Sequence, residues 1–141
     1  MEYTLRIEGE GEPIVLSSQS QRAISKVEFV ISQEDLATAD RSENLFNSIV
    51  VSGLILAENQ TVTKDLLNWS LKTNRAEIYK TVSLTIKKDN DVIRDYYLKN
   101  MFCTRYEECF DESQKETSML GSFILSMRQR RGFIDTIKVD C

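Results

Sequence analysis

This chain of 141 residues contains no histidine, which limits the chemistry that its side chains could perform. A serine or cysteine nucleophile at neutral pH commonly relies on a neighbouring imidazole as its base, so arrangements of that kind are excluded. A lysine or a carboxylate could act as base instead, but neither a Ser-x-x-Lys nor a Gly-x-Ser-x-Gly pattern occurs. The sequence therefore predicts no catalytic residue and assigns no reaction class.

Cysteines and carboxylates are the remaining candidates for a metal site. The three cysteines, Cys103, Cys109 and Cys141, are odd in number and lack the closely spaced pairs that structural zinc sites use. They are interpreted as free thiols. Carboxylates cluster from Glu34 to Asp40 and from Glu107 to Glu112, in polar segments where acidic residues usually face solvent. We expect neither a metal ion nor another cofactor.

Nucleic acid is not an expected partner either, because the net charge of −4 repels phosphate polymers. Glutamates flank Gly9 and Gly11 and would repel a phosphate. The main basic cluster, Arg128 to Arg131 with Lys138 nearby, is interpreted as a solvated strand end. Aromatic residues recur beside acidic ones, which favours core packing or a protein interface over base stacking. These aromatics are Tyr96, Tyr97, Phe102, Tyr106 and Phe110.

The composition predicts one soluble globular domain spanning residues 1–141, because 41% of the residues are hydrophobic and 28% are charged. A run of about 20 apolar residues, as a membrane span needs, does not occur. The glutamate-rich start has no apolar segment behind a basic one, so we expect synthesis in the cytoplasm without a cleavable signal. Export by a machine that needs no such signal remains open.

Alternation of apolar and polar residues predicts strands along most of the chain. The expected strands cover residues 2–8, 14–16, 23–33, 46–57, 78–87, 92–106, 121–130 and 133–139, with a hairpin turn at 87–91. Gly53, inside the most apolar strand, is interpreted as a bulge or a point of close backbone approach. In the strand over 92–106 the phase is imperfect, since Tyr97 and Met101 share one face while Leu98 and Phe102 share the other. We therefore expect protein on both faces of that strand.

One segment has helical rather than strand periodicity. Leu66, Leu67 and Leu71 fall on one stripe and predict a helix over about 62–73. Thr63 is placed to cap its beginning, and Asn74 can take the left-handed conformation that ends it.

The predicted strands have more apolar surface than this helix can cover. Two of them, residues 46–57 and 92–106, carry apolar residues on both faces, and exposed sheet edges promote uncontrolled pairing. Either the sheets close into a barrel with the helix on one flank, or neighbouring subunits supply the cover.

The order of elements resembles that of the tube-forming proteins of contractile injection systems. These are the haemolysin-coregulated protein of type VI secretion and the tail-tube proteins of phages and phage-like particles. The resemblance runs from about Val51 to Arg131, through a helix (DLLNWSL), a hairpin (IYKTVSLTIKKDNDVIRDYYLKNMF), an acidic loop and a late strand (GSFILSMRQRR). It implies six-membered rings that stack into a hollow tube. By position, residues 33–44 correspond to a family loop that reaches a neighbouring subunit.

We therefore expect a mainly β protein, a two-sheet β-barrel or sandwich with one flanking helix, that is a structural subunit and not an enzyme. Its expected partners are copies of itself, with sheath and spike or baseplate proteins as further candidates. The candidate interface residues are Leu36, Leu45, Phe46, Tyr97 and Phe102. Two alternatives remain open, a non-polymerising adaptor or baseplate protein of the same fold and a monomeric β-barrel that binds an apolar small molecule.

Overall fold

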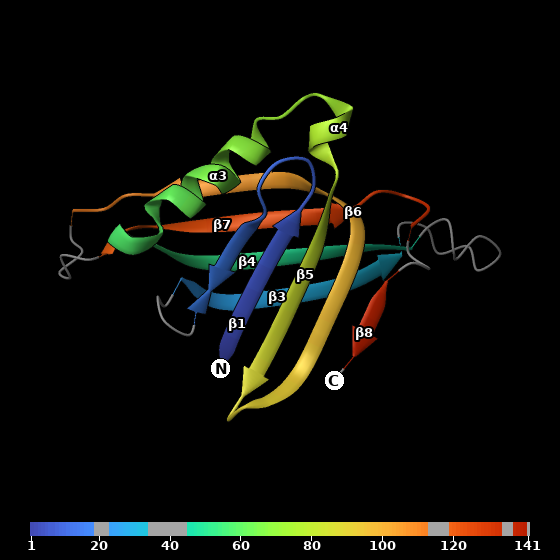
Figure 1. Ribbon diagram of the computed structural model, residues 1–141, viewed down its shortest axis with the longest axis horizontal. Coiled ribbons are helices and arrows are strands. Elements are labelled where there is room, and N and C mark those ends of the chain that lie inside the picture. The colour runs from blue at the N-terminus through green and yellow to red at the C-terminus, as the bar shows by residue number, and fades with distance from the viewer. Residues whose placement is uncertain (19–22, 34–44, 113–118, 134–136, 141) are drawn as a thin grey trace.

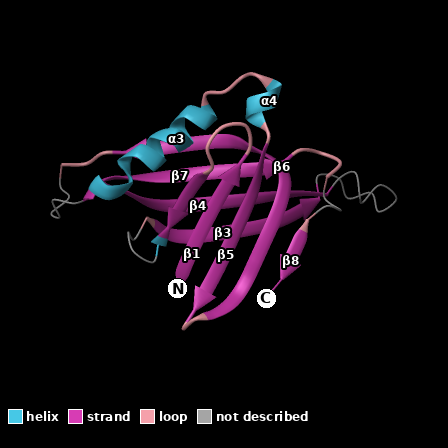
Figure 2. Cartoon of the chain, in the orientation of Figure 1, coloured by secondary structure: helices cyan, strands magenta, loops and turns pink. Residues whose placement is uncertain are grey.

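The computed structural model describes residues 1–18, 23–33, 45–112, 119–133 and 137–140, which form antiparallel strands and one long helix (Figure 1, Figure 2). The strands are β1 (Glu2–Glu8), β2 (Ile14–Ser17), β3 (Ile24–Gln33), β4 (Leu45–Leu56), β5 (Lys80–Lys88), β6 (Asp91–Cys109), β7 (Met119–Gln129) and β8 (Lys138–Asp140). The helical segments are a 3-10 turn, η2 (Ala57–Asn59), the helix α3 (Gln60–Ser70) and the short helix α4 (Arg75–Ile78). The predicted mainly β class with one flanking helix is confirmed.

All eight strands belong to one antiparallel sheet that folds over on itself. Its strand order is β2-β1-β5-β6-β7-β4-β3, and β8 pairs with β6 outside this path. Figure 1 shows β1, β2 and β5 in front of β3, β4 and β7, whose strands cross behind them. The path does not close, because β2 and β3 end it. Of the two predicted forms, the structure is therefore a sandwich.

The strand β6 connects the two layers. Its first half pairs with β5 and its second half, from Met101 onward, pairs with β7. Asn100 has a φ of 58°, and the register to β5 shifts between Leu98 and Met101. Because this bulge resets the alternation, Leu98 and Met101 are both fully buried. The predicted grouping of Tyr97 with Met101 on one face is therefore wrong. The bulge alone explains the irregular order of apolar residues along β6, without protein on both faces of the strand.

The core lies between the two layers and consists of the apolar positions that period two selects. The front layer contributes Leu5, Ile7, Leu16, Val82 and Leu84, and the back layer contributes Ile49, Val51, Phe123, Leu125 and Met127, all at most 1% exposed. Their burial fills the interlayer space with side chains, which is the packing expected of a sandwich.

Gly53 is a point of close backbone approach, as the sequence predicts. The N–H of Leu54 donates a 3.0 Å hydrogen bond to the carbonyl oxygen of Ala23, which brings β3 and β4 together just where β3 carries a bulge. The ring of Phe123 lies against the same position from β7. A side chain at position 53 has no room there.

The predicted hairpin between β5 and β6 is confirmed. Lys88 pairs with Asp91, which leaves a two-residue turn. Asp89 and Asn90 both have positive φ, 53° and 69°, as the turn that best fits strand twist requires.

The helix α3 begins and ends earlier than predicted. Thr63 does not cap it but lies buried within it, where its hydroxyl donates to the carbonyl oxygens of Asn59 and Gln60 at 3.2 and 3.1 Å. Asn59 organises the turn before α3, because its side chain accepts from the N–H of Leu56 at 2.7 Å. Asn74 does not end the helix. Its side chain instead caps α4 by accepting from the N–H of Ala76.

The helix α3 covers one open end of the sandwich, above β2 and β6 (Figure 1). Leu66 and Trp69 are its buried apolar side chains, and the indole Nε1–H of Trp69 donates to the carbonyl oxygen of Ile78 at 2.9 Å. Among the described residues no helix is long and apolar enough to cross a membrane.

Candidate assembly surfaces

The strand β3 is a free sheet edge within the described part of the chain. It is ten residues long and pairs only with β4. Val30 and Ile31 are 48% and 49% exposed on it, and its charged residues Lys26 and Glu28 pair with each other at 2.8 Å. A long edge with exposed apolar residues is a template for pairing with another chain, since its outer N–H and C=O groups point away from the sheet.

The outward side of β4 and β7 forms a second surface, here called the uncharged face. It consists of Ser48, Val50, Ser52 and Leu54 on β4 and Ser122, Ile124 and Ser126 on β7. None of these seven side chains is charged, and Ile124 is 40% exposed. Ion pairs flank the face, Lys26 with Glu28 on β3 and Arg105 with Glu107 on β6. Four of the seven side chains are serines and three are aliphatic, so the face is uncharged rather than apolar. A face without charges is typical of a surface that meets protein, because charged residues are depleted at the centre of interfaces.

The predicted interface residues do not form one patch of free apolar side chains. Phe46 is half-buried, and the guanidinium of Arg128 lies 4.1 Å from the centre of its ring. Tyr97 is exposed, with the ammonium of Lys138 5.8 Å from its ring centre. Leu45 is half-buried at the beginning of β4.

Two further interface predictions have different outcomes. Phe102 is half-buried and packs edge-on against Tyr79, with 5.8 Å between the ring centres. Leu36 lies outside the described residues, as do residues 34–44 of the predicted family loop with their acidic cluster, whereas Gln33 is the last residue of β3.

The basic residues near the end of β7 lie on aromatic rings, which the sequence did not predict. The guanidinium of Arg130 is 5.1 Å from the ring centre of Tyr79 and 6.0 Å from that of Phe133. We call this set the cation–aromatic cluster. It consists of Phe46, Tyr79, Tyr97, Phe102, Phe133, Arg128, Arg130 and Lys138. These aromatic residues have acidic neighbours in sequence, but two of them have basic partners on the adjacent strands. Phe102 pairs with Arg128, and Tyr97 pairs with Lys138.

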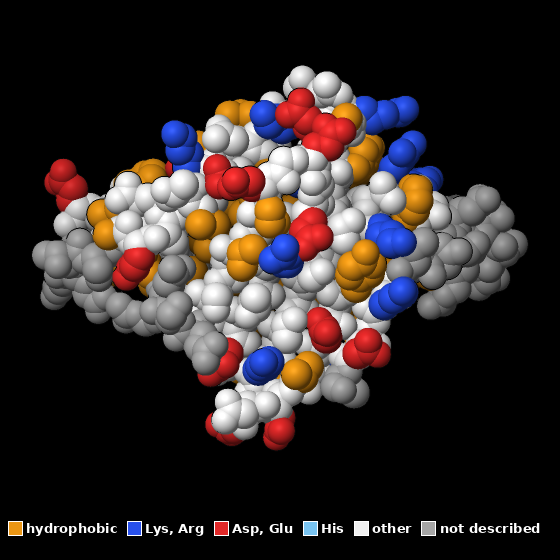
Figure 3. All heavy atoms as spheres, viewed as in Figure 1, with side chains coloured by type: hydrophobic (Ala, Val, Ile, Leu, Met, Phe, Trp, Pro, Cys, Tyr) orange, Lys and Arg blue, Asp and Glu red, His pale blue; other side chains and the backbone are white. Residues whose placement is uncertain are grey.

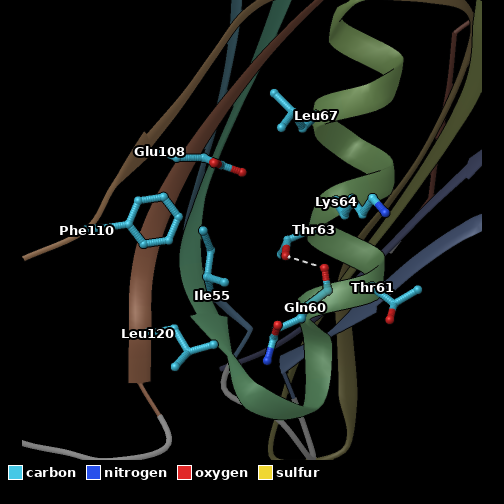
Figure 4. A pocket seen from close by; sticks show the side chains of 9 residues that line it. All are labelled: Ile55, Gln60, Thr61, Thr63, Lys64, Leu67, Glu108, Phe110 and Leu120. Atoms are coloured by element: carbon cyan, nitrogen blue, oxygen red, sulfur yellow. Dashed lines mark hydrogen bonds between the residues drawn. The ribbon is translucent and has the colours of Figure 1, made fainter.

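A groove opens at the other end of β7, between α3 and the strand ends (Figure 4). Thr63, Lys64 and Leu67 of α3 form one wall, and Glu108, Phe110 and Leu120 face them across Ile55. Its volume is about 350 Å³. Phe110 is 64% exposed, so much apolar surface of the groove is open to solvent.

Tyr106 lies behind this groove and ties β6 to α3. Its hydroxyl donates to the carboxylate of Glu108 at 2.9 Å and lies 3.4 Å from the carbonyl oxygen of Thr63. Burial raises the pKa of Tyr106 well above its usual range, and the hydrogen bond to Glu108 raises the pKa further. Burial also raises the pKa of the nearby Cys103 thiol.

These two groups predict a loss of stability at alkaline pH. The unfolded chain releases the Tyr106 proton near pH 10, while the folded chain keeps it, so the stabilisation is complete below that pH and declines as the pH rises through it. Urea unfolding between pH 7 and pH 10.5 should show this decline, and Tyr106→Phe should make it shallower. Tyr97→Phe, which removes a hydroxyl from an exposed position of the same strand, is the matched control. An unchanged alkaline slope in Tyr106→Phe would contradict the assignment.

Neither a family model nor a curated protein matches the chain. Solved structures do. A crystal structure of an Hcp protein is 13% identical, with 99% of this chain and 98% of that chain covered and a TM-score of 0.60. Hcp1 from Flavobacterium johnsoniae is 15% identical over 96% and 94% of the two chains, with a TM-score of 0.52.

A third similar structure is a chain of the PVC sheath-tube complex in the extended state, an extracellular contractile injection system. It is 15% identical, covers 99% of this chain and 88% of that chain, and has a TM-score of 0.52. At such identities the likeness concerns the fold. The chain has, over nearly its whole length, the fold found in Hcp proteins and in components of contractile injection systems.

Proposed function

We propose that this chain is a structural subunit that joins copies of itself into six-membered rings, which stack into the hollow tube of a phage-tail-like or type VI-like injection system. The observation that carries the proposal is the fold shared with an Hcp protein along 99% of this chain and 98% of that one. The shared fold thus spans nearly the whole of both aligned chains.

The surfaces support self-association. The free edge of β3 and the uncharged face both lack cover within one described molecule. A neighbouring copy supplies such cover when two different surfaces meet head to tail, and contacts of this kind close into rings. The tightly filled interior, in contrast, supports a structural role better than the binding of a small apolar molecule between the sheets.

Further partners follow from the similar structures. One is a sheath-tube complex, and another is the baseplate of the anti-feeding prophage, 12% identical over 98% of this chain with a TM-score of 0.54. We propose contacts with sheath and spike or baseplate proteins, and a place in an exported phage-like particle. In this role the chain has no catalytic activity.

Size-exclusion chromatography with light scattering tests the proposal on the free edge. Val30→Lys with Ile31→Lys places two cations on β3, where lysine opposes edge pairing. The wild type should elute with the mass of a ring, and the double variant should need at least about tenfold more protein to assemble, since two buried charges weaken a contact by more than about 1.4 kcal/mol. Leu71→Lys, 68% exposed at the end of α3, is the control and should assemble normally.

One outcome would contradict the proposed function, and a second would contradict the part given to β3. A wild-type chain that stays monomeric at millimolar concentration has no ring-forming function, and would fit a non-polymerising adaptor of the same fold. A folded double variant that assembles like the wild type would remove β3 from the contact.

A further inference from the structure

We propose that the cation–aromatic cluster of one copy docks on the groove beside α3 of the next copy, so that the two ends of the molecule form a contact between copies. This rests on the proposed function and adds a second pair of surfaces to the free edge of β3 and the uncharged face. The occupant of the groove is thus a second copy of this chain.

The two surfaces lie too far apart to meet within one molecule. Leu120 lines the groove at the beginning of β7, and Arg130 follows the end of the same strand, ten positions later. An extended strand rises about 3.3 Å per residue, which separates them by roughly 33 Å. Figure 3 shows basic side chains gathered along the right-hand edge, and acidic side chains at the left end as well as at the lower right and the bottom. A contact between these ends joins different surfaces, as ring closure requires.

The cation–aromatic cluster presents cations that are held in place by rings. Arg130 lies between Tyr79 and Phe133, and neither Arg130 nor Lys138 forms an ion pair with a carboxylate of the described residues. A guanidinium stacked on rings keeps N–H groups at its rim for a carboxylate. The same stacking occupies ring faces that nucleic acid bases would need. The cluster therefore fits an acidic protein surface better than a nucleic acid.

The groove offers the complementary chemistry. Its apolar surface comes from Leu67, Phe110 and Leu120, and Glu108 stands on its wall (Figure 4). From the described residues Glu108 accepts one hydrogen bond, that of Tyr106, and a carboxylate can accept several. Glu112 is exposed just beyond Phe110, and among the described residues that line the groove Lys64 on α3 is the one cation. A volume of about 350 Å³ accommodates a large side chain with a charged head.

A charge-swap experiment tests the pairing. Arg130→Glu with Lys138→Glu makes both ends of the molecule acidic, and Glu108→Lys with Glu112→Lys makes both ends basic. Each double variant alone should assemble at least about tenfold more weakly than wild type at 50 mM NaCl, because like charges meet at every contact. An equimolar mixture should regain assembly, since the acidic cluster of one variant then meets the basic groove of the other. Wild-type assembly should weaken between 50 and 500 mM NaCl.

Matched controls carry the same change in net charge elsewhere. Lys87→Glu with Lys88→Glu alters the hairpin turn, and Glu10→Lys with Glu12→Lys alters the loop after β1, all at exposed positions. Both should assemble like wild type. Circular dichroism establishes that each variant is folded, and if Arg130→Glu unfolds the chain, Lys138→Glu alone serves as the acidic variant.

The outcomes separate this inference from the proposed function. Wild-type rings together with normal assembly of both double variants overturn the inference and leave the ring subunit intact. Folded variants that fail alone and also fail in the mixture overturn it as well, because the lost contacts are then not paired charges. A monomeric wild type overturns the proposed function itself.

Discussion

Replacing Gly53 with alanine should destabilise the fold by at least about 3 kcal/mol, and replacing it with valine should prevent folding. A Cβ at this position would overlap the carbonyl oxygen of Ala23 and lie 2.7 Å from two ring carbons of Phe123. The oxygen belongs to the backbone directly before β3 and accepts the hydrogen bond of Leu54, so it cannot move without parting the beginning of β3 from β4. The clash therefore cannot be relieved by a side-chain rotation.

Urea unfolding followed by circular dichroism measures this effect. Gly9→Ala is the control, because a Cβ at Gly9 would meet only the flexible side chain of Lys80, 2.9 Å away. It should change the free energy of unfolding by less than about 0.5 kcal/mol. A Gly53→Ala protein within about 1 kcal/mol of wild type would show that β3 and β4 do not approach each other as described.

Trp69→Ala should cost about 3–5 kcal/mol, the second largest effect. Trp69 is almost completely buried and is the largest side chain with which α3 closes the end of the sandwich. Its removal leaves a cavity under the helix and an unsatisfied carbonyl at Ile78. Since α3 also forms one wall of the groove, the variant should lose ring assembly together with stability.

Trp69→Phe separates the two contributions. It keeps most of the packing but loses the 2.9 Å hydrogen bond to Ile78, so about 1–2 kcal/mol should be lost. Leu71→Ala, exposed at the end of the same helix, should be neutral in the same urea titration. Equal losses for Trp69→Ala and Leu71→Ala would mean that α3 is not docked on the sheets.

Local patterns predicted the elements well. The alternation around Leu5 and Ile7 identified β1 with its observed bounds, and the polar turn at 87–91 identified the hairpin. Gly53 was correctly interpreted because a glycine within an apolar strand has few structural reasons other than a bulge or close contact. Each of these signals is contained in a few neighbouring residues.

Other features depend on conformations or contacts that no local pattern encodes. The left-handed conformation of Asn100 shifts the alternation of inward and outward side chains along β6. Asparagine tolerates this conformation without requiring it, so the residue type alone does not predict the shift. The start of α3 was misplaced because Asn59 binds backward to Leu56 rather than capping the helix in the usual way.

The cation–aromatic cluster could be predicted only from the register of strands that lie far apart in sequence. Arg128 meets Phe102 only because β6 pairs with β7, and Arg130 meets Tyr79 although three strands separate them in sequence. Phe46 and Phe102, predicted as interface residues, are half-covered within their own chain, because Arg128 lies on the ring of Phe46 and Tyr79 packs against Phe102. An apolar residue on a strand face indicates that something covers it, but not which molecule does.

Negative-stain electron microscopy of the purified protein tests the central claim most directly. We expect rings with a central opening, which at higher protein concentration and low salt stack into tubes. Fields of separate particles with the mass of one chain, unchanged across concentration and salt, would contradict it.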